Sequence, residues 1–106
     1  MTSNNNGKIK YEFITRIWKH TGQGSWYFVS VPHELAKEIR NYLKSKEEGW
    51  GRLKATAKIG NTEWATAIWF DTKMNTYLLP IKAEIRKIGI RQKHSNYNLD
   101  LKNNER

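Results

Sequence analysis

The sequence predicts a mainly β protein, folded as one antiparallel barrel capped by helices. Apolar and polar residues alternate with period two over several runs, and short segments containing Gly and Asn separate these runs. Only two stretches show helical spacing, and the length of 106 residues suits a single domain. The expected order of elements is therefore β-β-α-β-β-β-α-β, which favours a barrel of hairpin-linked strands.

Two strands are expected at the start of the domain, over residues 8–18 and 25–31. In the first run, alternate positions share one face: Ile9, Tyr11, Phe13, Thr15 and Ile17. The second run is rich in aromatic and β-branched residues, which are typical of strands. A segment with two glycines, 20–24, connects the runs, so we expect them to pair as a hairpin.

A helix is expected next, at about residues 33–47. Pro32 suits the first helical position, because a proline has no N–H to leave unpaired there. Residues that repeat at spacings of three and four are expected in the core: Leu35, Ile39, Tyr42 and Leu43. The opposite side carries a basic row, which is either a solvated helix face or a groove-binding surface: Lys37, Arg40 and Lys44.

The centre of the chain predicts a β-hairpin whose strands span 52–59 and 63–70. Gly60-Asn61 is typical of a two-residue loop, and a loop of that length fixes the register of the two strands. The expected pairs are Lys58 with Glu63, Ala57 with Trp64, Leu53 with Ile68 and Arg52 with Trp69. In this register Leu53, Ala55, Ala57 and Ile59 share the inward face.

Three shorter elements complete the predicted domain. A strand at 77–79 ends near Pro80, a helix at about 82–88 ends before Gly89, and a final strand covers 97–101. The domain is therefore expected over 8–101. Residues 1–7 and 102–106 are polar and are expected to be disordered tails.

The composition is strongly basic and excludes several classes of protein. Lys and Arg number 19 against 10 Asp and Glu, and the net charge of +9 favours a polyanionic partner such as nucleic acid, although it also serves solubility alone. The absence of cysteine excludes disulfides, thiolate metal sites and a cysteine nucleophile. No apolar run is long enough to span a membrane and no secretory signal is found, so we expect a cytoplasmic protein without membrane contact.

No pattern in the sequence predicts catalysis, a metal or a cofactor. The histidines lie far apart without the spacing of a ligand set: His20, His33 and His94. No serine stands in a nucleophile elbow, and Gly22-Gln23-Gly24 lacks the further glycines and the helix of a phosphate-binding loop. We therefore expect a protein that is not an enzyme.

The outward face of the central hairpin carries the candidate polyanion site. It combines Arg52, Lys54 and Lys58 with Trp69, and cations beside an aromatic ring can hold phosphates and stack a base. Two simpler interpretations compete with this one. Arg52 stacks on Trp69 as a local cation–π pair, or Trp69 is buried under the first hairpin.

A second candidate site is a small anion site on the short helix. Lys82 and Arg86 are four residues apart, so their side chains share a face, and Lys82 lies near the helix start, where N–H groups attract anions. The competing interpretation is that Arg86 pairs with Glu84 or Asp100 while Lys82 is solvated.

Three motifs carry a resemblance to a known family: Trp26-x-Phe28-Val29-x-Val31-Pro32-x-Glu34, the Gly60-Asn61 hairpin, and Tyr77-Leu78-Leu79-Pro80-Ile81-Lys82-x-x-x-Arg86-Lys87-x-x-x-Ile90. With these motifs, residues 9–101 resemble a small prokaryotic domain of unknown function. The resemblance implies a double-split β-barrel, the fold of AbrB/MazE-like regulators, and in some relatives the domain precedes a bacteriocin-protection-type domain. The family usually has a Gly-Asp turn before its last strand, whereas residues 92–96 here lack that aspartate and are more basic.

Two functions follow as hypotheses, both for a binding module without catalysis. The first is weak, sequence-tolerant binding of nucleic acid or another polyanion. The second is binding of a protein partner or small ligand in an apolar groove between barrel and helix. Positive charge clustered beside exposed Trp would favour the first, and a concave, aromatic-lined pocket with scattered charge would favour the second.

Overall fold

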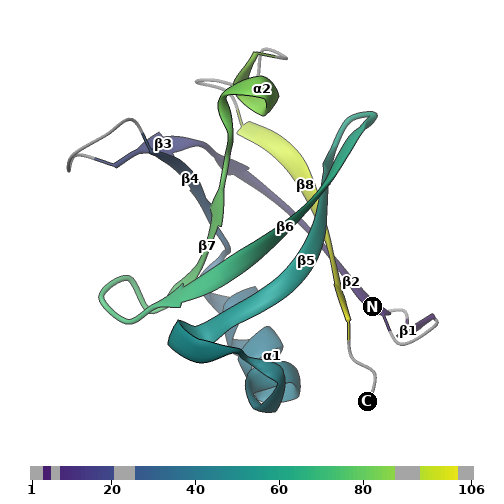
Figure 1. Cartoon of the computed structure of the whole chain (residues 1–106), viewed down its shortest axis with the longest axis vertical. Coiled ribbons are helices and arrows are strands. Elements are labelled where there is room, and N and C mark those ends of the chain that lie inside the picture. The colour runs from purple at the N-terminus through teal and green to yellow at the C-terminus, as the bar shows by residue number, and fades with distance from the viewer. Residues whose placement is uncertain (1–3, 6–7, 21–25, 88–93, 103–106) are drawn as a thin grey trace.

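A computed structural model describes residues 4–5, 8–20, 26–87 and 94–102 of the chain. It confirms a mainly β fold, with one curled antiparallel sheet and short helices at its ends (Figure 1). The strands are β1 (Asn4–Asn5), β2 (Lys8–Arg16), β3 (Trp18–Lys19), β4 (Tyr27–Ser30), β5 (Arg52–Ile59), β6 (Thr62–Asp71), β7 (Thr76–Pro80) and β8 (His94–Lys102). The helices are α1 (His33–Leu43) and α2 (Ala83–Arg86), with 3-10 turns at Lys44–Lys46 and Gly49–Gly51.

The order of strands across the sheet is β1-β2-β8-β5-β6-β7-β4-β3. The strand predicted over 8–18 is divided at Ile17 into β2, which is second in this order after the two-residue β1, and β3, which is last. One run of chain therefore contributes near both ends of the curled sheet. The buried Ile17 side chain lies at the point where the run changes its pairing partner.

The hairpin predicted between 8–18 and 25–31 is wrong for most of its length. Only β3 pairs with β4, through Trp18 opposite Phe28 and Lys19 opposite Tyr27. The whole of β2 pairs instead with β8, where Tyr11 lies opposite Leu99. The physical reason is apolar matching, because the inward side chains of β2 and β8 meet along a long ladder, and the short β3–β4 pairing offers far less burial.

The hairpin of β5 and β6 has the predicted register. Arg52 lies opposite Trp69 and Lys58 opposite Glu63, and Gly60 in the loop has a positive φ of 59°. The four inward side chains predicted for β5 are all buried: Leu53, Ala55, Ala57 and Ile59. A two-residue loop that needs a left-handed residue therefore sets the pairing, as the sequence indicates.

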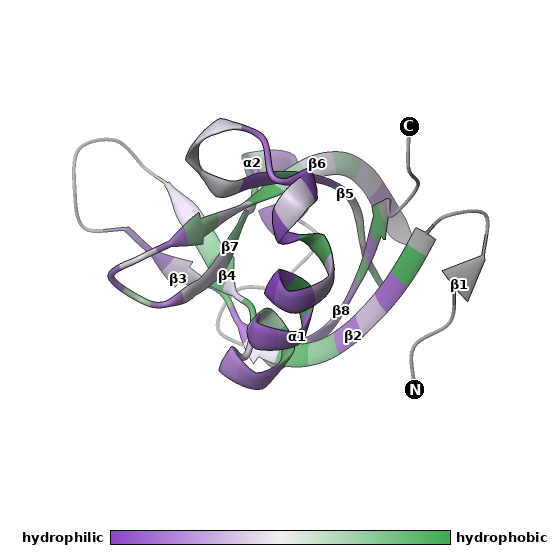
Figure 2. Ribbon diagram, turned by 90° about the horizontal axis from the view of Figure 1, so that it is seen from below, coloured by the Kyte–Doolittle hydropathy of each residue, from purple (hydrophilic) through white to green (hydrophobic). Residues whose placement is uncertain are grey.

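The helices lie at opposite ends of the curled sheet (Figure 1). Figure 2 shows α1 across one of these ends, where it buries Ala36, Ile39 and Leu43. Tyr42, which was predicted to be in the core, is 62% exposed. At 3.6 residues per turn, Tyr42 projects about a quarter turn away from the stripe formed by the three buried residues, and the small Ala36 occupies the core side instead.

The remaining elements differ from their predictions mainly in length. β7 and β8 are longer than the strands expected at 77–79 and 97–101, and α2 lies inside the predicted 82–88. Asn4 and Asn5 of the expected N-terminal tail pair with β2, and Lys102 belongs to β8. The rest of both expected tails lies outside the described residues, as do Gln92 and Lys93 of the departing segment 92–96 and the end of the predicted short helix, whereas residues 94–96 belong to β8.

The bend at Ile17 yields a stability prediction. We expect Ile17→Ala to lower the free energy of unfolding by about 2–5 kcal/mol, because it removes a buried side chain at the junction of the two ends of the sheet. Ile14→Ala is the matched control, since Ile14 lies three residues away and is 65% exposed, and we expect a change within about 0.5 kcal/mol. Urea denaturation measures both, and equal losses would contradict this role for Ile17.

Candidate functional site

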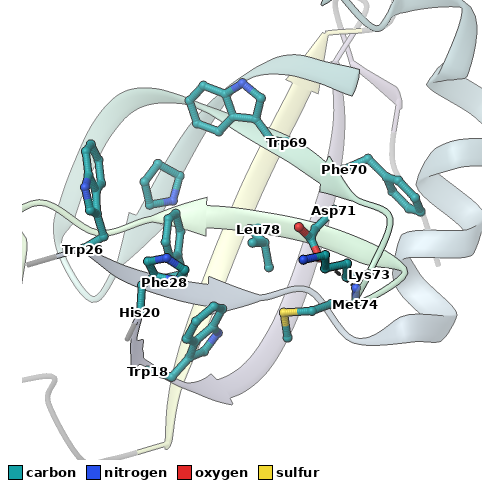
Figure 3. A pocket seen from close by; sticks show the side chains of 11 residues that line it. Trp18, His20, Trp26, Phe28, Trp69, Phe70, Asp71, Lys73, Met74 and Leu78 are labelled. Carbon is teal, nitrogen blue, oxygen red and sulfur yellow. Dashed lines mark hydrogen bonds between the residues drawn. The ribbon is translucent and has the colours of Figure 1, made fainter. Parts of the chain in front are cut away.

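The outer face of the sheet carries a groove of about 770 Å³ across β3, β4, β7 and β6. We call it the aromatic groove, and its main lining residues are Trp18, Trp26, Phe28, Trp69, Met74 and Leu78. In Figure 3, Trp69 lies on one side and Trp18 on the other, with Leu78 and Phe28 between them. A concave surface with several large rings is the arrangement found in sites for small ligands.

Strand pairing explains why these residues meet. Trp18 lies opposite Phe28 between β3 and β4, and Phe28 lies opposite Pro80 between β4 and β7. Leu78 of β7 lies opposite Trp69 of β6. Because paired residues project to the same face of a sheet, the outward positions of four strands form one continuous apolar surface.

The rings on the β3–β4 side form a packed wall. The Trp18 and Phe28 ring centroids are 5.3 Å apart, and those of Trp26 and Phe28 are 6.4 Å apart with nearly parallel planes. The indole N–H of Trp18 donates a 2.9 Å hydrogen bond to the Ser30 hydroxyl. These contacts hold the wall in place without a ligand.

Large apolar side chains of the groove remain open to solvent. Trp26 is 57% exposed, Met74 41% and Trp69 37%. Large rings are normally mostly buried, and exposed apolar patches mark places where a protein contacts a partner or ligand.

The Met74 end of the groove is held by the turn between β6 and β7. The Asp71 carboxylate accepts a 2.7 Å hydrogen bond from the Met74 N–H, and the Met74 carbonyl lies 2.9 Å from Nε2 of His33 on α1. Asn75 has a positive φ of 59°, a conformation that asparagine tolerates better than most residues. The turn that carries Lys73 and Met74 is therefore tied to both the sheet and α1.

Arg52 and Lys54 of β5 do not line the groove but lie beside Trp69 on the same outer face, opposite Trp69 and Ala67. The Arg52 guanidinium lies 5.8 Å from the centre of the Trp69 ring, so the cation–π pair expected as an alternative is present. It also makes a 2.6 Å ion pair with Glu48. Lys54 is exposed and lies opposite Ala67, and the alternative in which Trp69 is buried under the first hairpin is wrong.

Lys58, the fourth member of the predicted polyanion site, lies apart from the groove. It borders a smaller crevice of about 220 Å³ whose charged lining residues besides Lys58 are Glu63, Asp100 and Lys10. The predicted set is thus divided, because Trp69 lines the aromatic groove with Arg52 and Lys54 beside it, while Lys58 borders this separate crevice.

A half-buried ion pair supports the end of the groove near Phe70. Nε of Arg40 lies 3.2 Å from a carboxylate oxygen of Glu47, and the Arg40 guanidinium lies 3.7 Å from the Phe70 ring centre. The Tyr77 hydroxyl donates to Glu47, and burial together with this hydrogen bond raises the pKa of Tyr77 well above its usual value. Arg40, from the basic row of the helix, therefore has a packing role.

Arg86, of the predicted anion site formed with Lys82, has a different local partner from the carboxylates expected. The Arg86 guanidinium lies 3.9 Å from the ring centre of Tyr27, and Lys82 is exposed just before α2. Arg86 thus packs on an aromatic ring in place of the expected Glu84 or Asp100. Anion binding by Lys82 and Arg86 stays a prediction.

The aromatic groove itself was not predicted from the sequence. The signal available was the alternation that places Trp26, just before β4, on the same face as Phe28, together with the outward position of Trp18. That signal indicates a strand with an aromatic outer face, but the partners Leu78 and Trp69 become visible only once β4 is known to pair with β7.

Within the described part of the chain, no three His, Asp or Glu side chains gather closely enough to hold a metal ion. No helix in the same residues has the length and apolar character needed to cross a membrane.

Comparison with known protein families matches residues 13–93 to DUF1905, a domain of unknown function. The matched range contains all the residues that line the aromatic groove. A search of curated proteins finds no match.

The packing of Arg86 on Tyr27 yields a prediction for this pair of cations. We expect Arg86→Ala to lower the free energy of unfolding by about 1–2 kcal/mol, because it removes a partly buried cation–π contact. Lys82→Ala, which changes an exposed side chain, is expected to stay within about 0.5 kcal/mol. Thermal denaturation with and without sulfate adds the second readout. If sulfate raises the melting temperature of the wild type and of Arg86→Ala equally, Arg86 has a packing role. A larger rise in the wild type would instead establish the anion site.

Proposed function

Because the chain belongs to the DUF1905 family, whose function is unknown, we propose its function from the site: a binding module without catalysis that holds a flat ring in the aromatic groove. The observation that carries this proposal is the open apolar surface between Trp69 and the wall of Trp18, Phe28 and Trp26 (Figure 3). A flat ring can stack on these faces and gain apolar burial without disturbing the sheet.

The size of the groove supports a ligand larger than a single side chain. About 770 Å³ lies within the usual range of roughly 300–1,000 Å³ for small-molecule sites. The packed wall and the hydrogen-bonded β6–β7 turn already hold the groove side chains in position, so few of them need to become ordered when a ligand binds. A surface formed before binding loses less conformational entropy when the ligand arrives.

The groove lies in a different place from the one in the second sequence hypothesis. That hypothesis expected it between the barrel and the helix, whereas the aromatic groove lies on the outer face of β3, β4, β7 and β6. Its aromatic lining and scattered charge are the features that we expected to favour ligand binding over a purely electrostatic surface. The ion pair of Arg52 with Glu48 and the carboxylates near Lys58 support the same preference.

The proposal of a module without catalysis rests on the polar groups that the groove does contain. These are His20, Asp71 and Lys73. Asp71 already accepts the Met74 N–H, so its carboxylate serves the turn. We assign the groove a binding role for this reason.

Three finer sequence predictions also remain proposals. We propose that the curled sheet is the double-split barrel of AbrB/MazE-like regulators, which is supported by one chain run contributing near both ends of the sheet. A prokaryotic source is supported only by the resemblance of the motifs. A cytoplasmic location is supported by the lack of cysteine, because proteins of reducing compartments rarely contain disulfides.

Ring binding predicts a selective change in the tryptophan signals. On titration with indole or adenosine at millimolar concentration, we expect the indole N–H resonances of Trp26 and Trp69 to shift in nuclear magnetic resonance spectra. Trp64 is the internal control, because it is half-buried, packs against the core and does not line the groove. Adenosine and indole are uncharged at neutral pH, so the shifts should not depend on salt.

A variant makes this titration decisive. Trp69→Ala should greatly reduce the shift of the Trp26 signal, because one side of the groove is removed. Unchanged Trp26 and Trp69 signals in the wild type, or equal shifts at Trp64, would contradict ring binding in the groove.

A further inference from the structure

We infer that the ring held by the aromatic groove is a nucleobase of a single-stranded nucleic acid, with the adjoining phosphates on Lys54 and Lys73. This inference rests on the proposed function and names its ligand. It joins the rings of the groove to Lys73 in its lining and to Lys54 on the neighbouring strand β5. Stacked bases with a cationic path for the backbone are how proteins bind single strands without reading their sequence.

The first step is the shape of the stacking surface. Trp69 and the wall of Trp18 and Phe28 face a common space, and Trp26 extends that wall at one end (Figure 3). The rings therefore form an extended platform that is open to solvent at Trp26, which is 57% exposed. A strand can lay successive bases along such a platform, whereas an enclosed pocket would admit one ring only.

The second step is charge. Lys73 lines the groove on the β6–β7 turn. Lys54 lies outside the lining, on the same outer face of the neighbouring β5, opposite Ala67, and both lysines are exposed. The one acidic residue among those that line the groove in the described part of the chain, Asp71, accepts a hydrogen bond from the backbone of its own turn. The cations are thus placed for phosphates, and the net charge of +9 would draw a polyanion toward this face.

The third step separates a nucleic acid from a peptide. A peptide that adds to a sheet needs unpaired backbone groups along a strand. Here β4, β6 and β7 are each paired with strands on both sides, and the edge strand β3 is only the two residues Trp18–Lys19, so this face offers mainly side chains. Bases need only flat faces, and each phosphate needs only a nearby cation, so the surface meets the needs of a nucleic acid.

The test measures binding of a fluorescent ten-nucleotide thymidine strand by anisotropy, at salt concentrations from about 50 mM upward. We expect Trp26→Ala and Trp69→Ala each to weaken binding at least about fivefold, because each removes a stacking surface. The double variant Lys54→Ala with Lys73→Ala should reduce the slope of log affinity against log salt by about 1.4, because two phosphate contacts are lost.

Lys58→Ala is the matched control for the lysine variants. Lys58 lies on the same face of β5 as Lys54 and is also exposed, but it borders the separate 220 Å³ crevice with Glu63 and Asp100. The Lys58→Ala variant should bind the thymidine strand with the affinity of the wild type and with the same slope of log affinity against log salt. Circular dichroism of each variant shows that the fold is kept, and agreement between Trp26→Ala and Trp69→Ala guards against a local folding defect in either one.

Three outcomes would overturn the inference. The first is no binding of the thymidine strand at about 50 mM salt, where phosphate contacts are strongest. The second is equal binding of heparin, with no effect of either tryptophan variant, which would leave a purely electrostatic surface. The third is binding of thymidine nucleoside as tight as that of the strand, which would keep ring binding in the groove but exclude the nucleic acid.

Discussion

The bend of the chain at Ile17 is the constraint on which the other features of the molecule depend. Up to Arg16 the chain pairs with β8, and from Trp18 it pairs with β4, at the other end of the strand order. One run of residues thus curls the sheet and joins strands near its two ends. The same change of partner brings Trp18 beside Phe28 on the outer face, so the geometry that closes the core also forms one wall of the aromatic groove.

The two faces of the curled sheet use their aromatic residues differently. Inside, Tyr97 is fully buried and stacks with Phe13, and its hydroxyl has no hydrogen-bond partner among the described residues, so burial raises its pKa to about 12. Outside, Trp26 and Trp69 remain open to solvent although each could cover more apolar surface if buried. Exposed rings contribute less to the free energy of folding than buried rings do. Their exposure is therefore typical of a binding surface.

The part of the fold that could be predicted from the sequence is the part governed by local rules. A two-residue loop fixes the register of β5 and β6, and the alternation along β5 identifies its buried side chains. The pairings of β2 with β8 and of β4 with β7 join residues far apart in the chain, and alternation alone cannot choose between such partners. The groove depends on these distant pairings, so the sequence indicated Arg52, Lys54 and Trp69 but not the wall opposite them.

The central claim is that a base lies between Trp69 and Phe28 in the aromatic groove. The most direct measurement is the set of intermolecular nuclear Overhauser effects between the methyl protons of a bound thymidine strand and the protein. We predict contacts from these methyl groups to ring protons of Trp69 and Phe28. Contacts confined to the middle of the central hairpin, around Thr56 and Ala65, would contradict the account.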